Sequence, residues 1–233
     1  MYLFIALFVG ASGLYAQDCA KGYCPSTIVV HHKIGDLSAE TKDITYNVAK
    51  ITTTTLPTCW ITQNLGAPST PTAYTDYSTS YGGWGFQLGT SKGIIEGAAL
   101  PITTWTNFSS APSNWPTDKD PCTATFGSAW RLPTSAEWSL ALSGSTSWST
   151  SPKPNVGYTW YWTGSVTSFW TQGSSTFYAC RDYNTTNLAT FQSVFYGSTS
   201  WASVTVNTYW GNSSGTPQGT VALKVRCLKM LTD

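Results

Sequence analysis

The chain has 233 residues, of which 41% are hydrophobic, 15% are aromatic and only 10% are charged. Its 12 Lys and Arg nearly balance 11 Asp and Glu, which gives a net charge of +1. This balance gives no electrostatic reason to expect nucleic acid or an anionic membrane as a partner, and the apolar content argues against a disordered chain. The 12 Trp, 13 Tyr and 9 Phe are more than we expect one core to hold, so some rings should lie at the surface or at contacts with other molecules.

The first residues have the pattern of a secretory signal peptide. Residues 1–10 are almost entirely apolar and lead through small residues to Ala16, after which we predict cleavage. The apolar run is too short for the helix of about 20 residues that spans a bilayer. We therefore expect a secreted protein, extracellular or at the cell surface, with no membrane insertion once residues 1–16 are removed. The alternative is a buried N-terminal strand.

Six cysteines indicate an oxidising compartment and candidate disulfide bonds: Cys19, Cys24, Cys59, Cys122, Cys180 and Cys227. The sequence leaves their connectivity open, although Cys19 and Cys24 enclose a tight loop and are expected to pair with each other. Zinc is the competing explanation, but the chain has no Cys-x-x-Cys motif and its two histidines, His31 and His32, are adjacent. We therefore predict no metal site and no cofactor.

Residues 17–55 form a β-rich N-terminal extension ahead of the main domain, which we place at residues 56–233. Two long runs of β-branched residues, 26–34 and 43–55, predict strands in this extension. They can pair within the fold or with the edge of a neighbouring subunit, because an unpaired edge is a template for another strand. Removal of residues 17–50 is expected to abolish assembly and to leave the domain folded. The candidate assembly strand comprises Ile28, Val29, Val30 and Ile34.

One segment of the main domain carries clear signals for a helix. Thr134 is placed to cap the first turn and Glu137, three residues on, is placed to cap back, which is the capping-box pattern. Trp138, Ala141 and Leu142 fall on one helical face and are expected to pack inward.

The second half of the chain predicts short strands separated by turns, at residues 158–162, 176–180, 204–210 and 221–228. The last of these alternates most clearly, with Lys224 and Arg226 on the face opposite to its apolar residues. Short strands with one well-capped helix predict an α+β domain with long loops.

Four motifs occur in order between residues 50 and 229. They are Cys59-Trp-Ile-Thr-Gln-Asn-Leu-Gly66, then Asp120-Pro-Cys122 with Gly127-Ser-Ala-Trp-Arg-Leu-Pro-Thr-Ser-Ala-Glu-Trp138, then Tyr161-Trp-Thr-Gly-Ser165, and finally Ala222-Leu-Lys-Val-Arg-Cys-Leu-Lys229. As an ordered set they resemble the Fibrobacter succinogenes major paralogous domain family, found in secreted proteins of Bacteroidetes-type bacteria. The motif residues are Trp60, Asn64, Trp130, Arg131, Pro133, Thr134, Glu137, Trp138, Trp162 and Arg226.

The resemblance implies a C-type-lectin-like fold, a looped two-sheet structure whose first and last strands lie side by side. The expected fold class is therefore α+β: a C-type-lectin-like domain with short strands, long loops and one or two helices, preceded by the β-rich extension. The resemblance also implies a secreted protein, often at the cell surface, without an assigned catalytic activity. Many relatives lie at the ends of large adhesins, whereas this chain is short, which favours assembly through its own N-terminal extension.

Searches for catalytic and calcium-binding motifs favour a non-enzymatic protein. Formylglycine-generating enzymes share the Arg-Leu-Pro-Thr-x-x-Glu-Trp motif of residues 131–138, but they need a Gly-Gly-Ser-Trp segment that this sequence lacks. A calcium-dependent lectin needs a carboxylate before its Pro-Asn pair, and Lys153 stands there. Asp118 and Asp120 are expected in an exposed polar loop, so no acid–base pair is predicted. We therefore predict no catalytic residues.

Aromatic residues among Ser, Thr and Asn form a candidate contact surface in the second half of the chain: Trp170, Tyr183, Tyr196, Trp201 and Trp210. Exposed rings with polar neighbours suit contacts with glycans or cell-surface proteins. The other interpretation places these rings in the core or in subunit contacts.

Two functions remain under consideration. The first is an extracellular structural subunit that self-assembles into a surface filament or layer through its N-terminal β segment. The alternative is a monomeric cell-surface adhesin or glycan-binding module that uses the aromatic loops.

Overall fold

The computed structural model describes residues 23–33, 41–52, 57–70, 82–87, 89–94, 115–142, 159–163, 166–170, 175–182, 190–197, 200–208 and 221–231. The predicted signal peptide lies outside this part of the chain, as do Cys19, Ile34, Tyr183 and Trp210.

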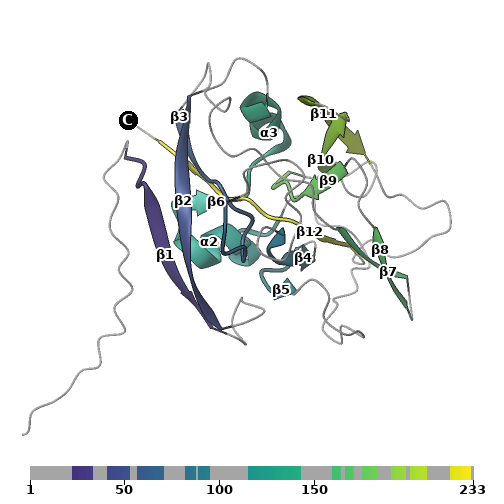
Figure 1. Ribbon diagram of the computed structural model, residues 1–233, viewed down its shortest axis with the longest axis horizontal. Coiled ribbons are helices and arrows are strands. Elements are labelled where there is room, and N and C mark those ends of the chain that lie inside the picture. Colours follow the sequence, from purple (N-terminus) through teal and green to yellow (C-terminus); the bar gives the residue numbers. More distant parts are fainter. Residues whose placement is uncertain are drawn as a thin grey trace, which may run out of the picture.

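A curved, half-barrel sheet of five antiparallel strands is the main element, in the order β1-β2-β3-β13-β6 (Figure 1). Its strands are β1 (Thr27–His32), β2 (Lys42–Thr52), β3 (Pro57–Ile61), β13 (Leu228–Met230) and β6 (Trp130–Arg131). The two predicted N-terminal strands are confirmed as β1 and β2. They pair with each other, and β2 pairs with β3, so both belong to the sheet of the main domain.

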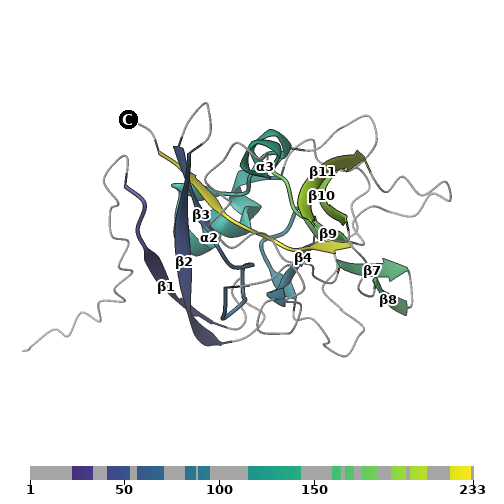
Figure 2. The same cartoon turned by 45° about the horizontal axis from the view of Figure 1, so that its top comes forward.

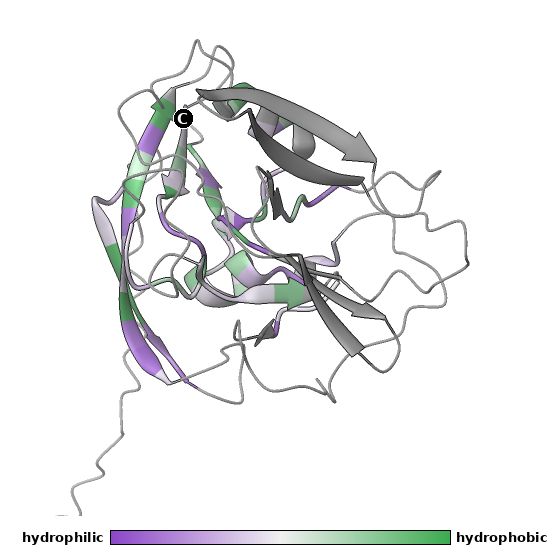
Figure 3. Ribbon diagram, turned by 45° about the vertical axis from the view of Figure 1, so that its right-hand side comes forward, coloured by the Kyte–Doolittle hydropathy of each residue, from purple (hydrophilic) through white to green (hydrophobic). Residues whose placement is uncertain are grey.

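Both faces of β2 contribute to the core, because Ile44 and Tyr46 lie on one face in the main apolar cluster and Ile51 lies on the opposite face in a second cluster. Hydrophobic and hydrophilic residues alternate along this strand (Figure 3), and Ile44, Tyr46 and Ile51 are at most 1% exposed. Deleting residues 17–50 would remove two of these side chains, so the domain is not expected to stay folded without that segment.

Two further sheets complete the described strands. One has the order β5-β4-β12-β7-β8, formed by β5 (Gly93–Ile94), β4 (Gly85–Gln87), β12 (Val221–Leu223), β7 (Thr159–Thr163) and β8 (Val166–Trp170). The other has the order β11-β10-β9, formed by β11 (Ser200–Thr208), β10 (Thr190–Gly197) and β9 (Ser175–Tyr178). Three of the four strands predicted after residue 155 are therefore confirmed, as β7, β9 and β11.

The helices are short. A 3-10 turn, η1 (Thr117–Lys119), precedes α2 (Pro121–Phe126), and α3 (Ser135–Leu142) is the predicted helix. The α3 helix lies between the first sheet and the β9–β11 sheet in both views (Figures 1 and 2). Its Trp138 ring lies 4.9 Å from the ring of Trp60 in β3 and 4.9 Å from that of Tyr178 in β9. The prediction that Trp138 and Ala141 pack inward is confirmed, because they are 0% and 1% exposed.

The strand predicted at residues 221–228 is wrong as a single element. The chain leaves β12 in one sheet and enters β13 in another, and residues 224–227 cross between them. The crossing segment has neighbours on both sides: the Ala179 N–H donates to the Lys224 carbonyl and the Leu65 N–H donates to the Val225 carbonyl, each at 2.9 Å. Lys224 and Arg226 are therefore fully buried, contrary to the two-faced pattern that the alternation suggested.

Two disulfide bonds join elements that are distant in sequence. Cys24 bonds Cys59 and Cys122 bonds Cys227, while Cys180 is a buried thiol. The predicted Cys19–Cys24 pair is wrong, because the segment that precedes β1 lies beside β3 and β13, where Cys24 bonds Cys59 and the Lys229 Nζ donates to the Tyr23 carbonyl at 3.3 Å. The bonds are consistent with an oxidising extracellular or periplasmic compartment. No helix of the described residues is long and apolar enough to cross a membrane.

Candidate functional site

The first sheet ends at β1, and the backbone of this strand has one paired and one outward side. The Val48 N–H donates to the Ser26 carbonyl at 2.9 Å, which makes Ser26 and Val48 a hydrogen-bonded pair. Hydrogen-bonded and non-hydrogen-bonded pairs alternate along an antiparallel ladder, and the register from Thr27↔Asn47 to His32↔Lys42 has no shift. The backbone groups of Thr27, Val29 and His31 therefore point away from β2. We call this outward side of the strand, formed by Thr27, Val29 and His31, the β1 edge.

The side chains of β1 divide into two faces. Ile28 and Val30 are half-buried and pack against the core, whereas Val29 is 69% exposed on the opposite face together with Thr27 and His31. The exposed His31 imidazole is paired with Asp43 on β2. The β1 edge is therefore apolar at its centre and polar at its ends.

Both ends of β1 are fixed to the rest of the fold. At the start, the Cys24–Cys59 disulfide ties the chain to β3, with Cα atoms 5.6 Å apart. At the end, His32 is 4% exposed, and a hydrogen bond of 2.9 Å joins its Nε2 to the Tyr46 hydroxyl. That hydroxyl also accepts the Gly66 N–H at 2.9 Å. The strand is thus held in an extended conformation before any partner binds.

The β1 edge has few of the features that block strand addition. Proteins usually protect an exposed edge with lysine, proline, a bulge or a covering element. Between Ser26 and His32 the strand has no Lys, Pro or Gly, and its register with β2 is regular. In the part of the chain that the structure describes, no strand pairs with its outward side.

A second group of polar side chains lies in the core, where the first motif meets the last. We call Asn64, Tyr178, Lys224 and Arg226, all fully buried, the buried polar cluster. The Asn64 Oδ1 accepts the Tyr178 hydroxyl at 2.9 Å and the Arg226 Nε–H at 3.1 Å, and Lys224 Nζ donates to the Gly83 carbonyl at 3.0 Å. These bonds link β9, the crossing segment and the loop after β3, so we assign the cluster a structural role.

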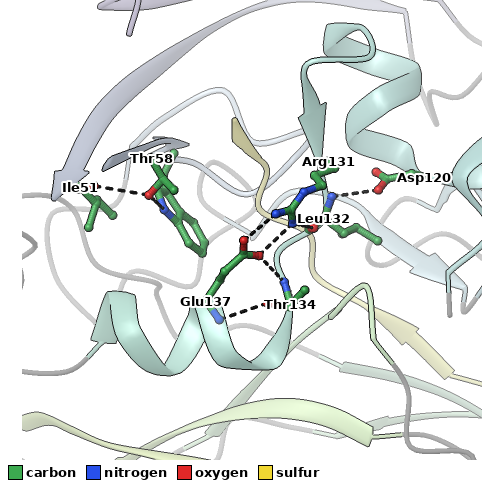
Figure 4. Close-up of polar contacts among 8 residues, drawn as sticks. Ile51, Thr58, Asp120, Arg131, Leu132, Thr134 and Glu137 are labelled. Atoms are coloured by element: carbon green, nitrogen blue, oxygen red, sulfur yellow. Dashed lines mark hydrogen bonds and ion pairs between the residues drawn. The ribbon is translucent and has the colours of Figure 1, made fainter. Parts of the chain in front are cut away.

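The central motif forms a third polar group, at the start of α3 (Figure 4). The Glu137 N–H donates to Thr134 Oγ1 at 3.2 Å and the Thr134 N–H donates to Glu137 Oε2 at 2.7 Å, which confirms the predicted capping box. Arg131 donates to both oxygens of the same carboxylate, at 2.8 and 2.5 Å. The carboxylate of Glu137 is therefore fully engaged.

Asp120 is a correction to the sequence analysis, because it is 2% exposed instead of lying in an open loop. It is the N-cap of α2 and accepts the N–H groups of Cys122 at 2.8 Å, Thr123 at 3.3 Å and Leu132 at 2.9 Å. The sequence signal for this cap was present, since Asp followed by Pro is a favoured helix start. Asp118 is exposed as predicted.

The two buried carboxylates have pKa values shifted in opposite directions. Burial raises the pKa of Asp120 and outweighs the hydrogen bonds from Leu132, Thr123 and Cys122. Burial also acts to raise the pKa of Glu137, but the hydrogen bonds from Arg131 and Thr134 bring it below its ordinary value. Ionisation of Glu137 therefore stabilises the fold, whereas ionisation of Asp120 costs stability.

Replacing Glu137 by glutamine is expected to lower the free energy of unfolding at pH 7 by about 1 to 3 kcal/mol, because a charge-assisted bidentate pair is lost. A lowered folded-state pKa means that this stabilisation is present above the ordinary value of 4.5 and is lost as the pH falls through the lowered value. Urea unfolding of the wild type and Glu137→Gln at pH 7 and pH 3 measures the change. The exposed Asp118→Asn serves as the control and should have little effect at either pH. A Glu137→Gln deficit of equal size at both pH values would contradict this assignment.

Some of the remaining predicted site residues are buried, and the side chains of others lie outside the described part of the structure. Trp60 and Trp130 are in the core and Pro133 is buried. Trp162, Trp170, Tyr196 and Trp201 lie on β7, β8, β10 and β11, but their side chains lie outside the described part of the structure. The candidate contact surface therefore lies outside the described side chains and stays a prediction. Of the candidate assembly strand, Ile28, Val29 and Val30 lie on β1.

The two buried carboxylates and the metal-ligating side chains are the groups that a catalytic or metal site would need. Among the described residues, no three His, Cys, Asp or Glu side chains lie close enough to hold a metal ion. The carboxylates of Asp120 and Glu137 are committed to helix caps. Sequence reasoning missed His32 as the residue that fixes the end of β1; its signal was an inward position beside two apolar neighbours on the same face.

Comparison with models of protein families, with curated proteins and with solved structures finds no match for this chain.

Proposed function

We propose that this protein is a non-enzymatic, extracellular structural subunit that self-assembles through the β1 edge. The observation that carries the proposal is the exposed and regular strand at the end of the first sheet, which has no Lys, Arg, Asp or Glu and has Val29 69% exposed at its centre. Such an edge is a template for another strand. The proposal differs from insertion of the whole extension into a neighbour, because β1 and β2 already pair within the chain.

The anchoring of β1 supports this role. A strand that is already extended and held at both ends loses little conformational entropy when a partner strand pairs with it. The Cys24–Cys59 bond would persist outside the cell, where thiols are oxidised. The signal-like residues 1–16 support secretion to that compartment.

The resemblance to the Fibrobacter succinogenes major paralogous domain remains part of the proposal. In favour of a C-type-lectin-like domain, the first strand after residue 56, β3, lies beside the last strand, β13, with the register Leu228↔Trp60. The buried bond from Arg226 Nε–H to Asn64 Oδ1 also joins the last motif to the first, and the half-buried Arg131–Glu137 pair fixes the centre of the second.

The alternative function, a glycan-binding module, depends on the aromatic residues of the second half of the chain. Their side chains lie outside the described part of the structure, so the geometry gives no observation that favours it. The described residues therefore favour self-assembly through the β1 edge.

Replacing Val29 by lysine is expected to weaken self-association at least about tenfold, because a charge at the centre of the edge opposes pairing with another strand. The change should leave the fold intact, since Val29 is 69% exposed. The matched control is Thr45→Lys, which adds the same charge at an exposed position directly opposite Val29 on β2. Sedimentation velocity over a concentration series measures the association.

The proposal predicts that the wild type and Thr45→Lys associate alike, while Val29→Lys associates at least about tenfold more weakly. A wild type that remains monomeric at every concentration would rule out self-assembly. If both lysine variants weaken self-association equally, the effect comes from net charge, and the β1 edge is not the contact.

A further inference from the structure

We infer that the partner of the β1 edge is the β1 edge of a second copy, paired antiparallel about a two-fold axis at Val29. This inference rests on the proposed self-assembly and names its contact. It predicts that Val29 lies opposite its own copy and that Thr27 of each chain lies opposite His31 of the other.

The backbone of β1 supports this register. The groups that point away from β2 belong to Thr27, Val29 and His31, which are spaced symmetrically about Val29. A two-fold axis at Val29 places each outward residue opposite an outward residue, which is the geometry of hydrogen-bonded pairs in an antiparallel ladder. The paired chains would extend the sheet across the axis without disturbing the β1–β2 bonds.

The side chains of β1 are also self-complementary about Val29. On the core face, Ile28 would lie opposite Val30 of the copy, so an apolar β-branched residue meets another. On the exposed face, Thr27 would lie opposite His31, and no like charges face each other on β1. Shifting the axis by one residue, to Val30, would place Ile28 opposite the buried and polar His32. The register centred on Val29 is therefore favoured.

The two ends of the first sheet differ in a way that favours a closed dimer. Head-to-tail growth through sheet edges would require β1 to pair with β6, the strand at the other end of the described sheet. That strand has 2 residues, whereas β1 has 6. A two-fold contact uses the same patch on both copies and closes on itself. The building unit is therefore a dimer, and growth beyond it would use another surface.

Cysteine cross-linking tests the register, in a Cys19→Ser background that removes the cysteine outside the described residues. Cα atoms of a hydrogen-bonded antiparallel pair are about 5.5 Å apart, within reach of a disulfide. Val29→Cys is therefore expected to give a covalent dimer under mild oxidation. Thr27→Cys and His31→Cys should each stay monomeric alone and should cross-link when the two proteins are mixed.

Thr45→Cys is the control, because the same axis places its two copies about 14 Å apart, across three strand spacings. Self-association of the wild type is measured in parallel by sedimentation. Association without a Val29→Cys dimer, or with a cross-linked Thr27→Cys homodimer, would overturn this register and leave self-assembly standing. A wild type that is monomeric throughout would remove both proposals.

Discussion

Replacing Cys122 and Cys227 together by alanine is expected to lower the free energy of unfolding by about 4 to 5 kcal/mol. The bond closes a loop with a sequence separation of 105 residues, and the chain-entropy model gives a cost of this size for a loop of that length. Both sulfurs are fully buried, where the bond ties α2 to the segment that enters β13. Because domains of this kind have stabilities of about 5 to 15 kcal/mol, the loss is a large share of the total.

Denaturant unfolding under non-reducing conditions measures this effect. The matched control is Cys180→Ala, which also removes a fully buried sulfur but breaks no disulfide. It is expected to cost about 1 to 2 kcal/mol, the range for a small core truncation. A double alanine variant no less stable than Cys180→Ala would show that the Cys122–Cys227 bond does not contribute in this way.

Replacing Asn64 by alanine is expected to lower the free energy of unfolding by about 3 to 5 kcal/mol, because it removes the acceptor of two buried hydrogen bonds. Its Oδ1 accepts both the Tyr178 hydroxyl and the Arg226 Nε–H, and its Nδ2 donates to the Gly82 carbonyl at 3.1 Å. The guanidinium of Arg226 is fully buried, so water cannot replace the lost bond. Thermal and urea unfolding of the variant measure the cost.

The control for Asn64 is Asn47→Ala, at an exposed position on β2. The Asn47 side chain donates to Thr70 at 3.0 Å near solvent, and its loss is expected to change stability by about 0.5 kcal/mol or less. Similar costs at the two positions would mean that the buried polar cluster does not stabilise the core as described.

The sequence predicted the elements whose signals are local. The capping box of Thr134 and Glu137 gave the start of α3, and runs of β-branched residues gave β1 and β2. The core position of Trp138 followed from the helical face on which the sequence places it. These features depend on residues a few positions apart, so a single sequence carries them.

The errors concern contacts between distant parts of the chain. The partner of Cys24 is 35 residues away, and nothing in the local sequence distinguishes it from the nearer Cys19. Lys224 and Arg226 alternate with apolar residues as in a half-exposed strand, but they lie in a crossing between two sheets and are buried on both sides. Asp120 is buried because Leu132, 12 residues on, also donates to it.

The candidate site could be predicted in part. The sequence indicated that residues 26–34 favour pairing as a strand, but it could not tell whether this strand pairs inside the chain. The structure pairs one side of β1 with β2 and leaves Thr27, Val29 and His31 facing outward. That division depends on which residues of β1 form hydrogen-bonded pairs with β2. The bond from the Val48 N–H to the Ser26 carbonyl determines this, and no sequence pattern encodes it.

Residue-resolved amide hydrogen exchange along β1, at low and high protein concentration, tests whether the protein assembles through the β1 edge. In the dilute protein, the amides of Ile28 and Val30 should be protected by β2, while those of Thr27, Val29 and His31 exchange rapidly. At concentrations where the protein associates, the three outward amides should become protected as well. Rapid exchange of these three amides in the associated protein would contradict assembly through the β1 edge.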